Sequence, residues 1–209
     1  MKKRKFSSLL VFLGLLFIVS GIGLIGYNLW DDNRASSEAW YVFDQISDII
    51  MQRTTEYDIS SFDVNAYDEE DVLDPDRAMP TVTVDGYRYI GIVSIASLAM
   101  ELPIMEEWDY TRMKLSPCRY KGSVYQNDFI ICGHNYRSHF GRLDDLQMYD
   151  AVTITDAEGN IYHYEVVTIE TLPGTSVEEM ESGMWDLTLF TCTYSGTSRV
   201  TVRCRRVDE

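Results

Sequence analysis

The chain begins with a long apolar run that directly follows a short basic cluster. Phe6 to Trp30 contains 25 residues without a charge, and residues 2–5 are all Lys or Arg. A helix needs about 20 apolar residues to cross a bilayer, and a preceding basic cluster stays in the cytoplasm. We therefore predict a single-pass signal-anchor over residues 1–30, in the cell membrane, with the N-terminus cytoplasmic and the remainder extracellular. A cleaved signal peptide is the alternative, but the run is longer than the usual apolar region of about 7 to 15 residues and lacks a clear A-x-A site.

Residues 31–79 show a helical pattern and then an acidic, polar stretch. From Ala35 to Arg53 six apolar residues recur near helical spacing: Trp40, Val42, Phe43, Ile46, Ile49 and Ile50. This spacing predicts an extracellular helix, packed on the folded domain or standing off the membrane. Thr54 to Met79 is rich in Asp, Glu and Ser and indicates an exposed linker.

After Pro80 the pattern becomes that of short strands. β-branched and aromatic runs separated by turn residues include TVTVDG, YRYIGIVSI, SVYQNDFIICGH, AVTITDAEGNIYHYEVVTI, DLTLFTCTY and SRVTVRCRRV. The segment ITDAEGNIYHYEV predicts a hairpin, because alternating runs flank a turn that contains Asp, Gly and Asn. Short helices are expected at Arg142–Met148 and at Ser176–Glu181, where Glu179 follows Ser176 at capping-box spacing. We predict one mainly β domain over residues 80–209, and several short strands with few helices favour a closed or nearly closed barrel.

Charge and cysteine content exclude some classes of function. Residues 31–209 carry all 33 acids and 14 of the 18 Lys and Arg, a formal charge of −19. Such a surface repels phosphate, so nucleic-acid binding is not expected. The four cysteines form no C-x-x-C pair and have no histidines at zinc-ligand spacing, so we do not expect a structural metal site. Cys118, Cys132 and Cys204 are expected to be free, partly buried thiols.

Three residues at predicted strand ends suggest a catalytic site. Cys192 ends the run LTLFT, His134 follows the buried run DFIICG, and Arg199 opens the run that returns beside the cysteine. A thiol paired with an imidazole is the pattern of a nucleophile and its base, and an arginine provides a planar, permanently charged fork of donors. His163 lies within an alternating strand and His139 in a loop, which makes both weaker candidates. Arg203 lies about 13 Å farther along the strand than Arg199.

These segments resemble the sortase family of Gram-positive surface transpeptidases. The family motif T-L-x-T-C is matched by Thr188 to Cys192, CGHN resembles its histidine site, and YIGIVSI resembles an early strand of its barrel. The likeness extends over about Tyr87 to Val207. It implies a closed barrel of about eight strands. With no obvious lid segment ahead of the barrel and no second, C-terminal membrane run, a class D-like or class B-like sortase is the expected relative.

The resemblance also implies a cysteine transpeptidase mechanism. Cys192 would attack an LPXTG-like sorting signal of a surface protein and form a thioester, and His134 would act as general acid and base. Arg199 would stabilise the oxyanion and hold the substrate. The acyl group would pass to an amine of peptidoglycan or of a pilin. Two alternatives remain: a cysteine peptidase that hydrolyses the same bond, and a non-catalytic membrane-tethered binding barrel in which Cys192 pairs with Cys204.

Overall fold

The computed structural model describes residues 2–60 and 75–207 and divides the chain into two compact units, residues 1–34 and 35–209. Helix α1 (Lys2–Ser60) supplies all of the described part of the first unit. Its large apolar side chains, such as Phe12, Phe17 and Leu24, are exposed. In the described part of the chain one helix is long and apolar enough to cross a membrane, with a mean hydropathy of 2.7 in its most apolar window. The predicted N-terminal apolar helix is therefore present.

The second unit contains the rest of α1 and the strands. Ile46 and Ile50 of α1 are buried, as the helical spacing predicted, and Ala39 is buried as well, whereas Trp40 is 63% exposed. The helix also continues past Arg53 to Ser60, where a linker was expected. The Thr54 hydroxyl donates to the Ile50 carbonyl within this part of the helix. The remainder of the expected linker, residues 61–74, lies outside the described residues.

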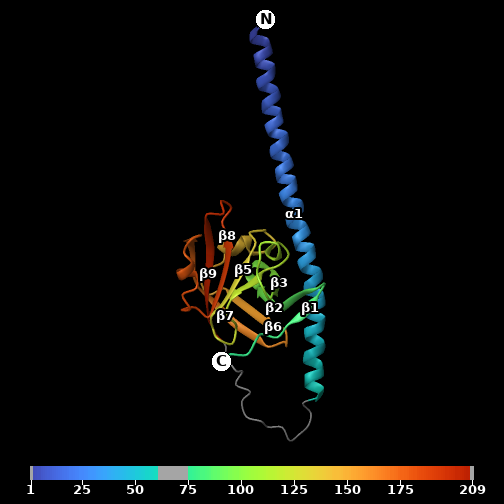
Figure 1. Cartoon of the computed structure of the whole chain (residues 1–209), viewed down its shortest axis with the longest axis vertical. Coiled ribbons are helices and arrows are strands. Elements are labelled where there is room, and N and C mark those ends of the chain that lie inside the picture. The colour runs from blue at the N-terminus through green and yellow to red at the C-terminus, as the bar shows by residue number, and fades with distance from the viewer. Residues whose placement is uncertain (1, 61–74, 208–209) are drawn as a thin grey trace. The chain divides into compact units, whose positions relative to one another are not determined.

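The strands form one closed barrel (Figure 1). Their order in the sheet is β1-β2-β3-β4-β5-β8-β9-β7-β6, and β2 also pairs with β6. This extra pairing closes a barrel of eight strands, with short β1 added to β2, and confirms the predicted mainly β fold. The strands are β1 (Val82–Val84), β2 (Tyr87–Ile95), β3 (Met100–Met105), β4 (Cys118–Lys121), β5 (Phe129–Gly133), β6 (Ala151–Asp156), β7 (Ile161–Pro173), β8 (Leu187–Cys192) and β9 (Ser198–Arg206).

Short helices connect several strands. They are η1 (Ala96–Leu98), η2 (Arg112–Lys114), η3 (Phe140–Asp145) and α2 (Val177–Met180). The helix predicted at Arg142–Met148 is a 3-10 helix that starts two residues earlier. The helix predicted at Ser176–Glu181 is present, but the side chain of Ser176 makes no capping hydrogen bond, so the expected capping box does not form.

Two apolar clusters hold the second unit together. The larger one includes the fully buried Ile90, Ile131, Leu189 and Val202. The second cluster joins Ile46 and Ile50 of α1 to side chains of β1, β2, β4 and β5. Each buried Val, Leu or Ile contributes about 1.5–3 kcal/mol through removal of apolar surface from water. The docked part of α1 is therefore part of the folded domain.

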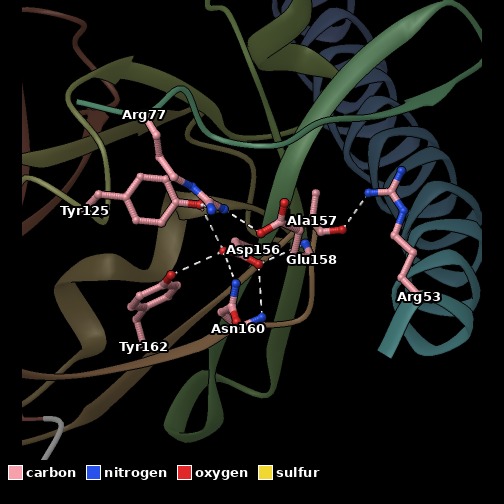
Figure 2. A network of polar contacts seen from close by, with 8 residues as sticks. All are labelled: Arg53, Arg77, Tyr125, Asp156, Ala157, Glu158, Asn160 and Tyr162. Atoms are coloured by element: carbon pink, nitrogen blue, oxygen red, sulfur yellow. Dashed lines mark hydrogen bonds and ion pairs between the residues drawn. The ribbon is translucent and has the colours of Figure 1, made fainter. Parts of the chain in front are cut away.

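The predicted β6–β7 hairpin is present, and a buried carboxylate organises its turn (Figure 2). The Asp156 side chain is fully buried and accepts hydrogen bonds from the hydroxyls of Tyr125 and Tyr162 and from the backbone and side-chain nitrogens of Asn160. The same turn receives Arg53 of α1, which donates to the carbonyl of Ala157 at 2.8 Å. The turn therefore links the helix to the barrel.

Candidate active site

Cys192 is the last residue of β8, and its side chain is half-buried. On one side β8 pairs in parallel with β5, and on the other side it pairs antiparallel with β9. Parallel neighbours end at the same edge of a sheet, and an antiparallel neighbour begins there. The register therefore brings the end of β5 and the start of β9 to either side of the cysteine.

His134 directly follows the end of β5. The last pair between β5 and β8 is Gly133 with Thr191, so His134 and Cys192 occupy the next position on the two adjacent strands. The buried Thr191 hydroxyl donates to the carbonyl of Gly133 at 2.9 Å and ties the two strand ends together. The imidazole of His134 is stacked on Tyr136, with 4.0 Å between ring centroids and an interplanar angle of 29°.

The other two histidines lie elsewhere. His139 is fully buried and meets the ring of Tyr136 edge-on at 5.5 Å. His163 is exposed on β7 and faces Thr153 of β6. His163 therefore lies on a strand pair that does not include β8, whereas His139 shares the ring of Tyr136 with His134.

Arg199 is the direct cross-strand partner of Cys192. One nitrogen of its guanidinium, Nη1, donates to the carbonyls of Gly196 and Ser198, both at 3.1 Å. Gly174 lies beside this group, since a Cβ added there would approach Nη1 to 3.4 Å. The short turn between β8 and β9 therefore holds Arg199 next to Cys192. Arg203 is only 2% exposed and binds other groups, so it is not available at this site.

All four cysteines lie in the described part of the chain, and all are free. Cys204 is paired with Leu187 at the far end of β8, so the disulfide between Cys192 and Cys204 that the binding-barrel alternative allowed is absent. Burial raises the pKa of Cys132 and of Cys204 to about 12 and also raises the pKa of Cys118. These three thiols are therefore poor nucleophiles at neutral pH.

A pocket of about 150 Å³ opens beside Cys192 and Arg199. Aromatic rings form one wall. Tyr120 meets Phe190 edge-on with 5.3 Å between ring centroids, and the tilted rings of Tyr120 and Trp108 lie 5.5 Å apart. Trp108 and Tyr110 are 41% and 73% exposed, so the aromatic wall continues to the surface. The lining consists of Trp108, Tyr110, Met113, Tyr120, Cys132, Gly133, Pro173, Gly174, Ser176, Val177, Met180, Phe190, Cys192 and Arg199. An apolar pocket with a thiol and a guanidinium at its edge can hold the side chain of a peptide next to a nucleophile.

Sequence analysis singled out Cys192, His134 and Arg199, but it missed the walls of the pocket. The aromatic rings come from the segment between β3 and β4, from β4 and from β8, and a further part of the lining comes from α2. Aromatic residues in an otherwise polar loop, as in EEWDY, were the available signal.

Comparison with known proteins now identifies the fold. The family model for the sortase domain matches residues 93–207, more than half of the chain. The chain belongs to the sortase family. It is 25% identical over 199 residues to sortase A of Bacillus anthracis, which covers 92% of this chain and 89% of that protein.

Solved sortase structures have the same fold. Sortase C of Streptococcus pneumoniae superimposes with a TM-score of 0.58 at 17% identity, covering 81% of this chain and 97% of that one. Sortase A of Corynebacterium diphtheriae gives a TM-score of 0.54 at 19% identity, covering 85% and 93% of the two chains. These neighbours carry different class names, so the class D-like or class B-like assignment stays a prediction.

Proposed function

We propose that this sortase is a membrane-anchored cysteine transpeptidase that cleaves an LPXTG-like sorting signal and transfers the acyl group to an amine of the cell wall or of a pilin. The observation that carries the proposal is the register around β8. Cys192 has Arg199 as its cross-strand partner, and the parallel pairing that ends at Gly133 and Thr191 sets His134 at the neighbouring strand end. Nucleophile, acid–base group and cation thus belong to three adjacent strands.

The two half-reactions follow from this arrangement. The Cys192 sulfur forms a bond to the peptide carbonyl carbon, and the proton that the thiol has given up resides on His134. When the carbon–nitrogen bond breaks, His134 gives this proton to the departing amine, which leaves a thioester. An incoming amine then attacks the thioester, His134 takes its proton, and the sulfur departs. Arg199 stabilises the oxyanion that forms in each half-reaction.

The N-terminal helix supplies the location. The four basic residues at 2–5 precede an uncharged run of 25 residues, so the positive-inside rule orients the chain with its N-terminus in the cytoplasm. The barrel then lies on the outer face of the membrane, where surface proteins and cell-wall amines are found. Both substrates are peptides or amines, and neither half-reaction uses a metal or an organic cofactor.

The test is turnover of an LPXTG-like peptide by the full chain in detergent, with and without a small amine. We expect Cys192→Ala to abolish turnover, His134→Ala to lower it by about 10²–10⁴ and Arg199→Ala by about 10²–10³. Arg199→Lys should also be strongly impaired, because a point charge does not reproduce the planar fork.

Matched controls are Cys204→Ala, His163→Ala and Arg88→Ala, which lie away from the pocket. We expect each control to keep most of the wild-type rate. Turnover by Cys192→Ala equal to that of the wild type would refute the proposal. If the acyl group is transferred only to water and never to the added amine, the cysteine peptidase alternative would be established instead.

A further inference from the structure

Arg203 is the largest fully buried side chain of the described residues, and it lies close to the pocket without lining it. We propose that Arg203 is a positioning residue that fixes residues 174–186, the segment that contains α2, as one wall of the peptide pocket. This inference rests on the proposed function, because the wall is argued to hold the sorting-signal peptide.

The side chain of Arg203 points to the outer face of the sheet. Its neighbours Val202 and Cys204 both belong to the large apolar cluster, and side chains alternate along a strand, so Arg203 faces the opposite way. An arginine on the outer face of a barrel strand normally lies in water. Here only 2% of it is exposed, because residues 174–186 cover it.

The guanidinium joins this covering segment to the sheet. Nη1 donates to the carbonyl of Met180 at 3.0 Å, and Nη2 donates to the carbonyl of Glu179 at 2.7 Å. Nη1 also donates to the Thr188 hydroxyl of β8, and Nε donates to Glu170 of β7, at 3.0 and 2.9 Å. Two contacts therefore go to α2 and two to the strands beneath it.

The two carbonyls lie at the C-terminal end of α2, a helix of four residues. The last carbonyls of any helix lack partners within it, and a cation there also meets the negative end of the backbone dipoles. A helix this short has no stability of its own. Arg203 therefore supplies the contacts that keep α2 folded against β8 and β9.

A gain in stability does not by itself explain why a buried arginine occupies position 203. Removing a guanidinium from water costs several kcal/mol, and an apolar residue of similar volume is often as stable at such a position. What an apolar residue cannot supply is a fixed direction for the covering segment. That direction matters here because Val177 and Met180 of α2 line the pocket together with the aromatic rings.

A second contact, at an exposed position, also holds residues 174–186 to the barrel. Lys121 of β4 pairs with Glu181 at 2.7 Å, and this cation lowers the pKa of the Glu181 carboxyl. Its neighbour Tyr120 belongs to the aromatic wall. The ion pair thus links the end of α2 to β4, the strand that carries Tyr120.

We call the contacts of Arg203 and Lys121 with residues 174–186 the clamp. The clamp should act on peptide binding and leave the chemistry of Cys192 unchanged. Arg203 touches none of Cys192, His134 and Arg199 through a described hydrogen bond. Loosening the wall removes contacts that the peptide makes in both ground state and transition state, which raises KM with kcat unchanged.

The experiment compares Arg203→Met with wild type in full chains in detergent, using an LPXTG-like peptide and an added amine. We expect KM for the peptide to rise about tenfold and kcat to stay within about twofold. Amide hydrogen exchange of residues 174–186 should become faster, while exchange in β8 is unchanged. Arg77→Met removes an arginine that pairs with Glu158 at the β6–β7 turn and should change neither KM nor the exchange of this segment.

A milder variant covers the case in which Arg203→Met does not fold. Lys121→Met breaks the exposed ion pair with Glu181, and we expect a KM increase of about two- to threefold with kcat unchanged. Wild-type KM and wild-type exchange of residues 174–186 in both variants would overturn the proposal. So would a fall in kcat with KM unchanged.

The proposed function and the clamp can fail separately. If the wild type does not turn over peptide, the proposed function fails, and hydrogen exchange of Arg203→Met still decides whether Arg203 holds the segment. If the wild type is active but both variants have wild-type KM and exchange, only the clamp is refuted.

Discussion

At the scale of single residues, the four cysteines differ in how strongly their surroundings disfavour the charged thiolate. Cys118, Cys132 and Cys204 are buried, and desolvation raises the pKa of each thiol. Cys192 is half-buried at the end of β8, beside a pocket and an arginine. Burial therefore separates one accessible sulfur from three protected ones.

A labelling experiment checks this difference. At pH 8 we expect iodoacetamide to modify Cys192 of the folded chain and to leave the other three thiols unmodified, since a thiol with a pKa of about 12 is protonated until the pH approaches that value. Peptide mapping by mass spectrometry identifies the labelled site, and denatured protein should be labelled at all four. Rapid labelling of Cys132 in the folded chain would contradict the expectation.

The sequence could predict which residues stand at strand ends, but it could not predict what covers them. Cys192, His134 and Arg199 were found because each borders an alternating or apolar run. Arg203 was correctly placed on the face of Arg199, yet its burial was not foreseen, because a period-two pattern says nothing of a segment that folds over that face. Their catalytic roles stay a prediction.

At the scale of elements, the β6–β7 hairpin depends on one buried carboxylate. Asp156 accepts hydrogen bonds from Tyr125, Tyr162, Asn160 and the backbone of Glu158 (Figure 2). Burial raises the pKa of the Tyr125 hydroxyl to about 12. Both tyrosines therefore remain protonated donors at neutral pH.

We expect Asp156→Ala to lower the free energy of unfolding by about 2–4 kcal/mol, because several buried donors lose their acceptor at once. The matched change Glu158→Ala removes a carboxylate that pairs with Arg77 at the surface of the same turn and should cost less than about 1 kcal/mol. Chemical denaturation of the full chains in detergent measures both. Equal losses in the two variants would show that the buried network is not what stabilises the turn.

Two strands were missed from the sequence for local reasons. Residues 100–105 contain Pro103, which usually indicates an edge or no strand. In the structure β3 pairs with β4 only at Met105 and Cys118, so Pro103 does lie where the strand has one partner. Strand β4 is four residues long with a register shift, too short for alternation to be recognised.

At the scale of the whole molecule, closure of the barrel depends on the contact between β2 and β6. Gly91 of β2 is paired with Asp156 and has φ 155°. A Cβ at this position would overlap the carbonyl oxygen of Thr155 and lie 3.0 Å from the Cα of Asp156. The backbone of β6, which cannot rotate away, therefore excludes a side chain here.

We expect Gly91→Ala to lower the free energy of unfolding by about 2–4 kcal/mol, since overlap with backbone adds to the conformational cost of the substitution. Gly86→Ala is the control, because Gly86 has φ 80° and open space around it; its cost should be about 1 kcal/mol. Chemical denaturation of the two full-length variants gives the difference. Equal stabilities would mean that the barrel tolerates separation of β2 from β6.

The order of strands around the barrel also sets the order of events during assembly. Strand β9 follows every other strand in the chain, yet it lies between β7 and β8. Until β9 is inserted, β8 has an unpaired edge and Cys192 lacks its neighbour Arg199. Cys192 and Arg199 belong to one local hairpin, but the pairing that sets His134 beside Cys192 joins segments 58 residues apart. Pairings between distant segments form slowly, so the reaction centre is assembled only when the barrel is complete.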